Sequence, residues 1–181
     1  MTSVFRSTAA TLLALACAFP AGAQEAPDTA AEQTKRESVS LPLEATRSVA
    51  LDTDNGTWLS LDVSPDGNTV VFEMLGDLYT VPLTGGDATR LTSGLAYDTQ
   101  PRYSPDGSTL LFLSDRSGGE NLWTLELATG DTTQITQGNG SAWMSPDWTP
   151  DGQYVVASKS DSRLGVHRLW MGHVDGGAGQ I

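Results

Sequence analysis

Short apolar runs alternate with one polar turn that occurs three times between residues 64 and 181. The turn reads Ser-Pro-Asp-Gly at residues 64–67 and 104–107, and Thr-Pro-Asp-Gly at residues 149–152. In such a turn Pro sets the first corner, Asp can accept a hydrogen bond from its own backbone, and Gly tolerates the left-handed corner. Because an apolar run follows every copy, the pattern predicts one structural unit repeated three times.

Further landmarks follow each turn in the same order. A run of strand-forming residues comes first, at 70–72, 110–112 and 154–156, and a strand in which an aromatic residue follows leucine comes next, at 78–81, 122–125 and 169–171. Glycine-containing segments then predict hairpins. In the first two repeats these lead to an outer fourth strand at 90–92 and 134–136, whereas the third repeat reaches Ile181 before such a strand.

The turns are 40 and 45 residues apart, which is the length of one four-stranded propeller blade. We therefore predict an all-β fold: a partial β-propeller over residues 47–181, with blades at about 56–94, 95–138 and 139–181 and the last blade incomplete. Closed propellers have about four to eight blades. The favoured interpretation is the N-terminal fragment of a larger protein, and the alternative is closure by association with more copies or with another chain.

The N-terminal residues have the features of an export signal. Arg6 precedes an apolar stretch at 9–19, and Ala21-Gly22-Ala23 fits a cleavage site. We predict a signal peptide over 1–23, cleavage after Ala23, and a periplasmic or secreted protein with no membrane insertion after cleavage. Cys17 is the only cysteine, and lipidation there is the alternative to plain cleavage.

Two segments lie between the signal and the first repeat. Residues 24–46 are rich in Ala, Glu, Thr and Ser with few bulky apolar groups, which predicts a disordered linker. Residues 47–51 alternate and predict a strand.

The charge of the chain limits its partners. The formal net charge is −12, and the ten Lys and Arg residues are scattered. A phosphate backbone requires clustered cationic side chains, so we exclude nucleic acid as a partner. The expected partners are a protein or peptide, or a missing downstream catalytic domain.

Motifs for catalysis and metal binding are not found in the sequence. It contains no Gly-x-Ser-x-Gly, and His167 and His173 form no metal-binding pair. Residues 52–56 resemble the start of a calcium loop but fit a turn better. We predict no catalytic residue, no cofactor and no metal site. Trp143 and Trp148 are candidates for ligand contact, although packing is the favoured role for both.

Several of these stretches resemble a known family. The turns, Leu-Phe-Leu-Ser-Asp-Arg at 111–116, Asn-Leu-Trp at 121–123 and Gln-Ile-Thr at 134–136 resemble the TolB-type WD-like propeller repeats. More narrowly, residues 52–58, 76–79 and 169–171 resemble the propeller that precedes the metal-dependent amidohydrolase domain in exported bacterial fusion proteins. In those proteins the catalytic residues lie on a separate downstream barrel, so the resemblance implies none in this chain.

Three functions are compatible with the sequence. The first is an exported propeller that serves as a binding or scaffold module. The second is the propeller part of a periplasmic metal-dependent amidohydrolase, a C–N bond hydrolase whose catalytic domain is absent here. The third is a Tol-like envelope interaction protein, against which the short polar segment 24–46 counts, because such a protein has a small folded domain ahead of its propeller.

Overall fold

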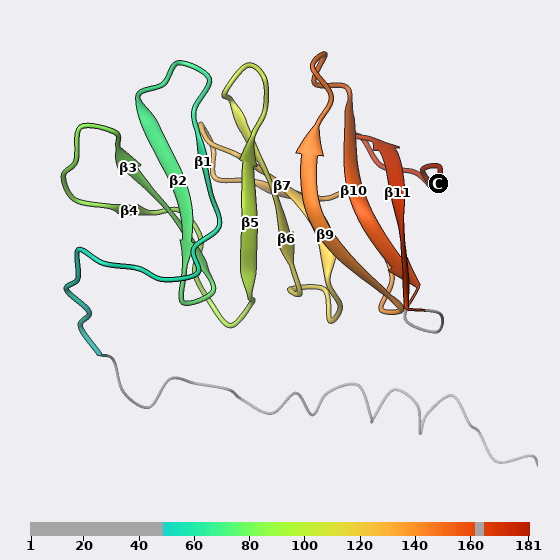
Figure 1. Ribbon diagram of the computed structural model, residues 1–181, viewed down its shortest axis with the longest axis horizontal. Helices are drawn as coiled ribbons and strands as arrows, with labels where there is room; N and C mark the ends of the chain where they lie inside the picture. Colours follow the sequence, from blue (N-terminus) through green and yellow to red (C-terminus); the bar gives the residue numbers. More distant parts are fainter. Residues whose placement is uncertain (1–48, 162–164) are drawn as a thin grey trace, which may run out of the picture. The chain divides into compact units, whose positions relative to one another are not determined.

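The computed structural model describes residues 49–161 and 165–181, and within them it contains eleven strands and no helix (Figure 1). No helix of this part is therefore long and apolar enough to cross a membrane. The predicted signal peptide, its cleavage after Ala23, the alternative at Cys17 and the linker at 24–46 lie outside the described residues.

The strands form three antiparallel sheets, and in each sheet the strands pair in chain order. The first sheet consists of β1 (Leu61–Val63), β2 (Thr69–Met74), β3 (Asp77–Pro82) and β4 (Thr89–Arg90). The second consists of β5 (Asp98–Tyr103), β6 (Thr109–Ser114), β7 (Asn121–Glu126) and β8 (Thr132–Gln134). The third consists of β9 (Ser141–Trp148), β10 (Tyr154–Asp161) and β11 (Val166–His173).

The repeated turn joins the first and second strands of every sheet. In the first copy the Gly67 amide donates to the Ser64 carbonyl over 2.8 Å, and Gly67 has φ +74°. The other copies repeat this bond, with Gly107 at φ +76° and Gly152 at φ +69°. Only glycine adopts this conformation without a steric cost, so the turn and its position between strands agree with the prediction.

The third sheet contains only the beginning of a fourth strand. Met171 and Gln180 exchange two backbone hydrogen bonds of 2.9 and 2.8 Å. This bridge corresponds to the pair Thr80–Thr89 in the first sheet. The three sheets form a partial β-propeller with an incomplete last blade, as the sequence predicted.

The strand predicted at residues 47–51 is wrong for the residues that the structure describes. Residues 49–60 contain no strand, and the first strand begins at Leu61. The side chains of Val49 and Leu51 are 73% and 60% exposed. Among the described residues no strand pairs with this segment, so its alternating pattern joins no sheet there.

Each sheet has two different faces. We call forward the face that meets the following sheet and backward the face that meets the preceding one. Val71 and Leu78 are forward residues of the first sheet, and they pack against Tyr103, Leu110 and Phe112 of the second. The strand period of two explains how successive residues of β6 serve different interfaces.

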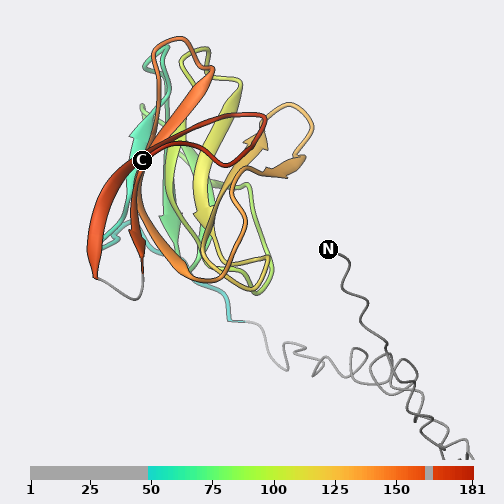
Figure 2. The ribbon, with the colours of Figure 1, turned by 90° about the vertical axis from the view of Figure 1, so that its right-hand side faces the viewer.

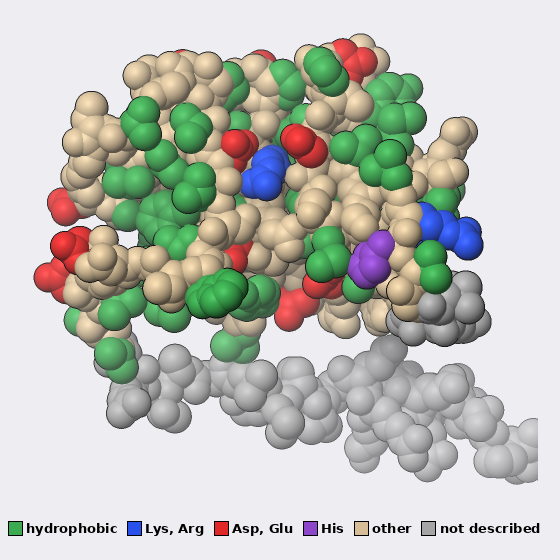
Figure 3. All heavy atoms as spheres, in the orientation of Figure 1, with side chains coloured by type: hydrophobic (Ala, Val, Ile, Leu, Met, Phe, Trp, Pro, Cys, Tyr) green, Lys and Arg blue, Asp and Glu red, His purple; other side chains and the backbone are tan. Residues whose placement is uncertain are grey.

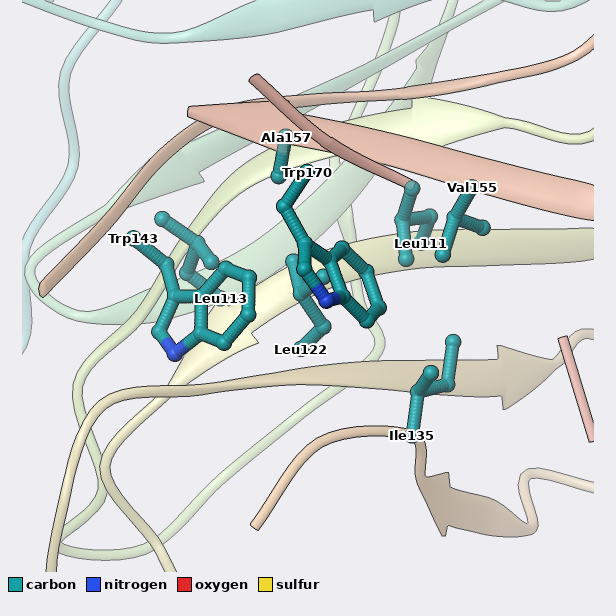
Figure 4. Close-up of a cluster of buried hydrophobic side chains, with 8 residues drawn as sticks. All are labelled: Leu111, Leu113, Leu122, Ile135, Trp143, Val155, Ala157 and Trp170. Carbon is teal, nitrogen blue, oxygen red and sulfur yellow. The ribbon is translucent and has the colours of Figure 1, made fainter. Parts of the chain in front are cut away.

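A second apolar cluster lies between the second and third sheets, as Figure 4 shows. The second sheet contributes its forward residues Leu111, Leu113 and Leu122, all at most 1% exposed. The remaining members are Ile135, Trp143, Val155, Ala157 and Trp170. The middle sheet is thus covered on both faces, and burial of these side chains supplies most of the drive for stacking the sheets.

Candidate functional site

The first strands of the three sheets are neighbours, and hydrogen bonds connect them across the sheets. An oxygen of Asp62 on β1 accepts from the amide of Tyr103 on β5, at 2.9 Å. The side-chain oxygen of Gln100 on β5 accepts from the amide of Ser145 on β9, at 2.6 Å. In a propeller the first strands lie closest to the central axis. β1, β5 and β9 therefore form one continuous surface on the axial side of the array.

Two of these strands contain bulges. The pairing of β5 with β6 shifts register between Thr99 and Arg102, and the pairing of β9 with β10 also shifts register. Gln100 and Ser145, which are equivalent in the repeat, have φ of +53° and +50°. Such a conformation costs a non-glycine residue roughly 1–3 kcal/mol and recurs at functional sites; Trp58 and Leu75, outside these two bulges, also have positive φ. Bulges also change the direction in which a side chain points.

Charged side chains occupy one equivalent position on the three first strands. Asp62, Arg102 and Asp147 follow one another at the same intervals of 40 and 45 residues as the turns. Asp62 and Arg102 are half-buried, and Asp147 is exposed. We call Asp62, Gln100, Arg102, Ser145 and Asp147 the inner-strand wall.

Backbone carbonyls position the single cation of the inner-strand wall. The Nη1 atom of Arg102 donates to the carbonyl of Leu61 at 3.0 Å and to that of Pro101 at 2.9 Å. Among residues 49–161 and 165–181 the Arg102 guanidinium belongs to no ion pair. Figure 3 shows one Lys or Arg patch between Asp or Glu patches on the face that carries β5. This arrangement can bind a polar ligand that carries charges of both signs.

The two tryptophans predicted as ligand contacts lie in separate places. Trp143 is 4% exposed and packs edge to face on Trp170, with ring centroids 4.9 Å apart. It borders a pocket of about 440 Å³, in which the Lys159 ammonium lies 4.9 Å from the centre of a Trp143 ring. Little of this ring is available for stacking on a ligand.

Trp148 is half-buried and borders a different pocket, of about 510 Å³, between the turns of the second and third sheets. Its indole nitrogen donates to the carbonyl of Arg102 at 3.2 Å. The packing role is therefore the better supported for both tryptophans, and ligand contact by either stays a prediction.

The aspartate of each of the three turns accepts hydrogen bonds from residues of the same turn. One oxygen of Asp106 accepts from the Ser104 hydroxyl at 2.6 Å and from the Ser108 amide at 3.0 Å, and Asp66 and Asp151 repeat this pattern. The hydroxyl hydrogen bond is the largest cause that lowers the pKa of each carboxyl below its usual value of 3.8, and the amide hydrogen bond is the second. A general acid or base near neutral pH needs the opposite shift.

The histidines and carboxylates of the described segments form no metal centre. No group of three or more His, Cys, Asp or Glu residues there could hold an ion. His173 instead lies 3.4 Å from Asp175 and packs edge to face on Tyr154. His167 lies 3.3 Å from the Ser158 hydroxyl.

Reasoning from the sequence missed the inner-strand wall, although a signal for part of it was present. The intervals that relate the turns also relate Asp62, Arg102 and Asp147. Aligning the repeats upstream of the turn would have placed three charges at one level of the first strands. No comparable signal marks Gln100 and Ser145, because a positive φ is expected of glycine and neither residue is one.

Comparison with known proteins finds relatives of the same repeat class. The chain is 30% identical over 124 residues to an uncharacterized protein of Agrobacterium fabrum, covering 63% of this chain and 42% of that protein. It is 29% identical over 106 residues to tricorn protease homolog 1 of Streptomyces coelicolor, covering 59% of this chain and 10% of that protein. The chain thus spans less than half the length of either relative.

A solved structure has the same fold. A protein from Agrobacterium tumefaciens, described as a candidate TolB, superposes with a TM-score of 0.58 at 27% identity, covering 65% of this chain and 46% of that one. The family described as the tricorn protease N-terminal beta propeller domain matches residues 59–181. That match covers all eleven strands, and the chain therefore belongs to the tricorn N-terminal β-propeller family.

Proposed function

We propose that this chain is an exported β-propeller binding module that contacts a protein or peptide through its inner-strand wall. The observation that carries the proposal is the placement of Asp62, Arg102 and Asp147 at one equivalent position on three consecutive first strands. The strained backbone at Gln100 and Ser145 lies in the same wall and supports a role beyond folding.

The expected ligand is an extended peptide with both cationic and anionic side chains. The wall presents carboxylate, guanidinium and carboxylate in order along three strands, and charges of opposite sign on the ligand would pair with them. The similarity to a protein named as a protease homologue is compatible with a polypeptide ligand. In this proposal the propeller binds and positions the chain, and any chemistry belongs to a companion domain.

The test is a binding assay with short fluorescein-labelled peptides that are acidic, basic, mixed in charge or uncharged. We expect the mixed peptide to bind best, and Arg102→Ala to weaken its binding about three- to fivefold, as expected for a partly exposed charge pair. Arg168→Ala is the matched control, because Arg168 is exposed on β11 outside the wall. Equal binding of all four peptides, or an equal effect of the two substitutions, would contradict the proposal.

Export is a separate part of the proposal. It rests on the sequence of residues 1–23. N-terminal sequencing of the protein recovered outside the cytoplasm is expected to begin at Gln24. A product that retains Met1, or one that begins at an acylated Cys17, would contradict cleavage after Ala23.

A Tol-like envelope role is the second candidate, and the similarity to the Agrobacterium tumefaciens structure is the observation that favours it. It predicts binding to an envelope protein rather than to short peptides. The amidohydrolase association stays a prediction that rests on residues 52–58, 76–79 and 169–171. For this chain by itself we expect no amide hydrolysis with added zinc, measured on N-acyl amino acids.

A further inference from the structure

The four asparagines of the chain differ in how the residue that follows each of them is held. Asn55 and Asn139 are followed by glycine, whereas Asn68 and Asn121 are followed by threonine and leucine. Asparagine is a thermolabile residue, because its side-chain amide can be attacked by the backbone nitrogen of the next residue. The surroundings of that nitrogen therefore decide how stable each asparagine is.

Two of the asparagines precede an amide that is hydrogen-bonded to a side-chain hydroxyl. The amide after Asn68 donates to the Ser64 hydroxyl at 2.9 Å. The amide after Asn121 donates to the Thr136 hydroxyl at 2.9 Å, and Asn121 itself is only 1% exposed. Either nitrogen must give up its hydrogen bond before it can attack, so the fold protects both asparagines.

Asn55 precedes a glycine, but neighbouring side chains hold it. The Thr53 hydroxyl accepts from the Asn55 amide at 3.1 Å and donates to the Asn55 carbonyl at 3.0 Å, and the Asn55 side chain donates to the Asp54 carboxylate. A Cβ added at Gly56 would collide with the Leu59 side chain, so this backbone has little free space beside it. These contacts hinder the approach of the asparagine side chain to the glycine nitrogen.

Asn139 is the least hindered of the four. It is exposed and lies in the coil that joins β8 to β9, drawn in orange in Figure 2. Its side-chain oxygen lies over Gly119, where a Cβ would come within 2.7 Å of it, and a glycine has no side chain that could hold the amide. A Cβ added at Gly140 would meet nothing within 4 Å. Within the described segments, no backbone carbonyl accepts a hydrogen bond from the Gly140 amide.

We propose that Asn139 is a site of spontaneous deamidation in the folded protein. The Gly140 nitrogen loses its proton to the solvent and attacks Cγ of Asn139. The new C–N bond closes a cyclic imide, and the Cγ–Nδ2 bond breaks to release ammonia. Water then opens the ring. Cleavage of the bond between the nitrogen and Cγ gives aspartate, and cleavage of the bond between the nitrogen and the main-chain carbonyl carbon gives isoaspartate.

Both products change the entry to β9. A carboxylate replaces a neutral amide, and isoaspartate also lengthens the main chain by one carbon atom. The coil is fixed on both sides, because the Gly138 carbonyl accepts from the Asn121 side chain at 3.0 Å and Ser141 is paired with β10. The added atom must therefore be accommodated by residues 139 and 140 or by β9, which carries Trp143 of the second apolar cluster. This inference does not depend on the proposed ligand.

The test is to age the purified full chain in its folded state at mildly alkaline pH, where the glycine amide loses its proton more readily. Peptide mapping by mass spectrometry follows each asparagine, and isoaspartate is identified by enzymatic methylation. We expect Asn139 to react at least about tenfold faster than Asn68 and Asn121, a ratio that the loss of one or two protecting hydrogen bonds produces. Asn139 should also react faster than Asn55.

The same chain unfolded in urea is the control for the contribution of the structure. Asn55 and Asn139 are both followed by glycine, so their rates are expected to converge once the contacts of Asn55 are lost. A difference that persists in the unfolded chain would overturn the assignment of the site to the fold. Equal rates at Asn139 and Asn68 in the folded chain, or a faster reaction at Asn55, would overturn the proposal itself.

Gly140→Ala tests the attacking nitrogen. Gly140 has no positive φ, and the space beside it accommodates a methyl group, so the variant should fold like the wild type, which circular dichroism checks. We expect the methyl group to restrict the backbone and to slow deamidation of Asn139 about tenfold, with the rate at Asn55 unchanged. A Gly140→Ala protein that loses Asn139 as fast as the wild type would overturn the proposal.

Discussion

The contact between the first and second sheets and the contact between the second and third use similar forward residues but fill the opposite side differently. Leu78 and Leu122 are equivalent, and both are fully buried. On the backward side, Phe112 of the second sheet corresponds to the much smaller Ala157 of the third. Trp143 supplies bulk where the second sheet has Asp98. The repeat thus keeps the direction of packing. The bulky side chain of the backward face, however, lies on the second strand of the second sheet and on the first strand of the third sheet.

The tryptophans of the two contacts give the largest expected difference. Trp170 is 2% exposed in the second contact, whereas Trp123 is only half-buried beside the first. Trp170→Ala should lower the free energy of unfolding by about 3–5 kcal/mol, and Trp123→Ala should lower it by less. Urea unfolding followed by circular dichroism measures both. Equal losses would mean that the two contacts are packed alike.

The ion pairs of the first two sheets are the next comparison. Arg116 contacts Asp98 at 2.8 Å, and Asp98 is 1% exposed; Arg90, which pairs with Asp77, is 48% exposed. Arg116→Met leaves a buried carboxylate without its partner and should cost about 3 kcal/mol. Arg90→Met should cost about 1 kcal/mol or less.

A second substitution checks the cause of that loss. Asp98→Leu in the Arg116→Met background removes the buried charge and should restore part of the stability in the same unfolding assay. The Arg116 guanidinium lies 5.0 Å from the ring centre of Phe112 and 5.1 Å from that of Trp123. Failure to recover any stability would show that Arg116 acts mainly through its packing on these two rings.

Substitution of the turn glycines should reveal a smaller difference in stability between the two contacts. Gly107→Ala and Gly152→Ala each force alanine to a positive φ, at a cost of about 1–2 kcal/mol. Gly107→Ala should cost more, because its new methyl group would lie 3.3 Å from Pro65 rather than 3.7 Å from Pro105. Thermal unfolding compares the two variants, and the reverse order would contradict the stacked arrangement of the turns.

The turn aspartates should give the smallest effect, which depends on pH. Because hydrogen bonds lower the pKa of Asp66, Asp106 and Asp151 in the folded chain, their stabilisation is present above the usual value of 3.8. It is lost as the pH falls from there through the lower folded values. The triple Asp→Asn variant should therefore show a flatter dependence of stability on pH below about 4. NMR titration of the three carboxyl groups checks the direction directly.

The sequence predicted the fold because the turn carries its own geometry. Gly67, Gly107 and Gly152 indicate a positive φ at the turn, and the intervals between them indicate the length of the repeated unit. The sequence could not predict that the small Ala157 stands where the second sheet has Phe112. That replacement depends on Trp143, which lies on β9 and comes next to β10 only when the two strands pair. Nor could it predict the strained Gln100, whose amide donates to Glu73 of another sheet at 2.8 Å.

Because the forward face of each sheet packs on the backward face of the next, the array of sheets has a direction. A unit gained by tandem duplication of the coding segment would dock at either end in one orientation only, with its leucine and aromatic surfaces already matched. Blade number can therefore change in evolution by whole units, while a blade turned end for end would meet a surface of the wrong shape.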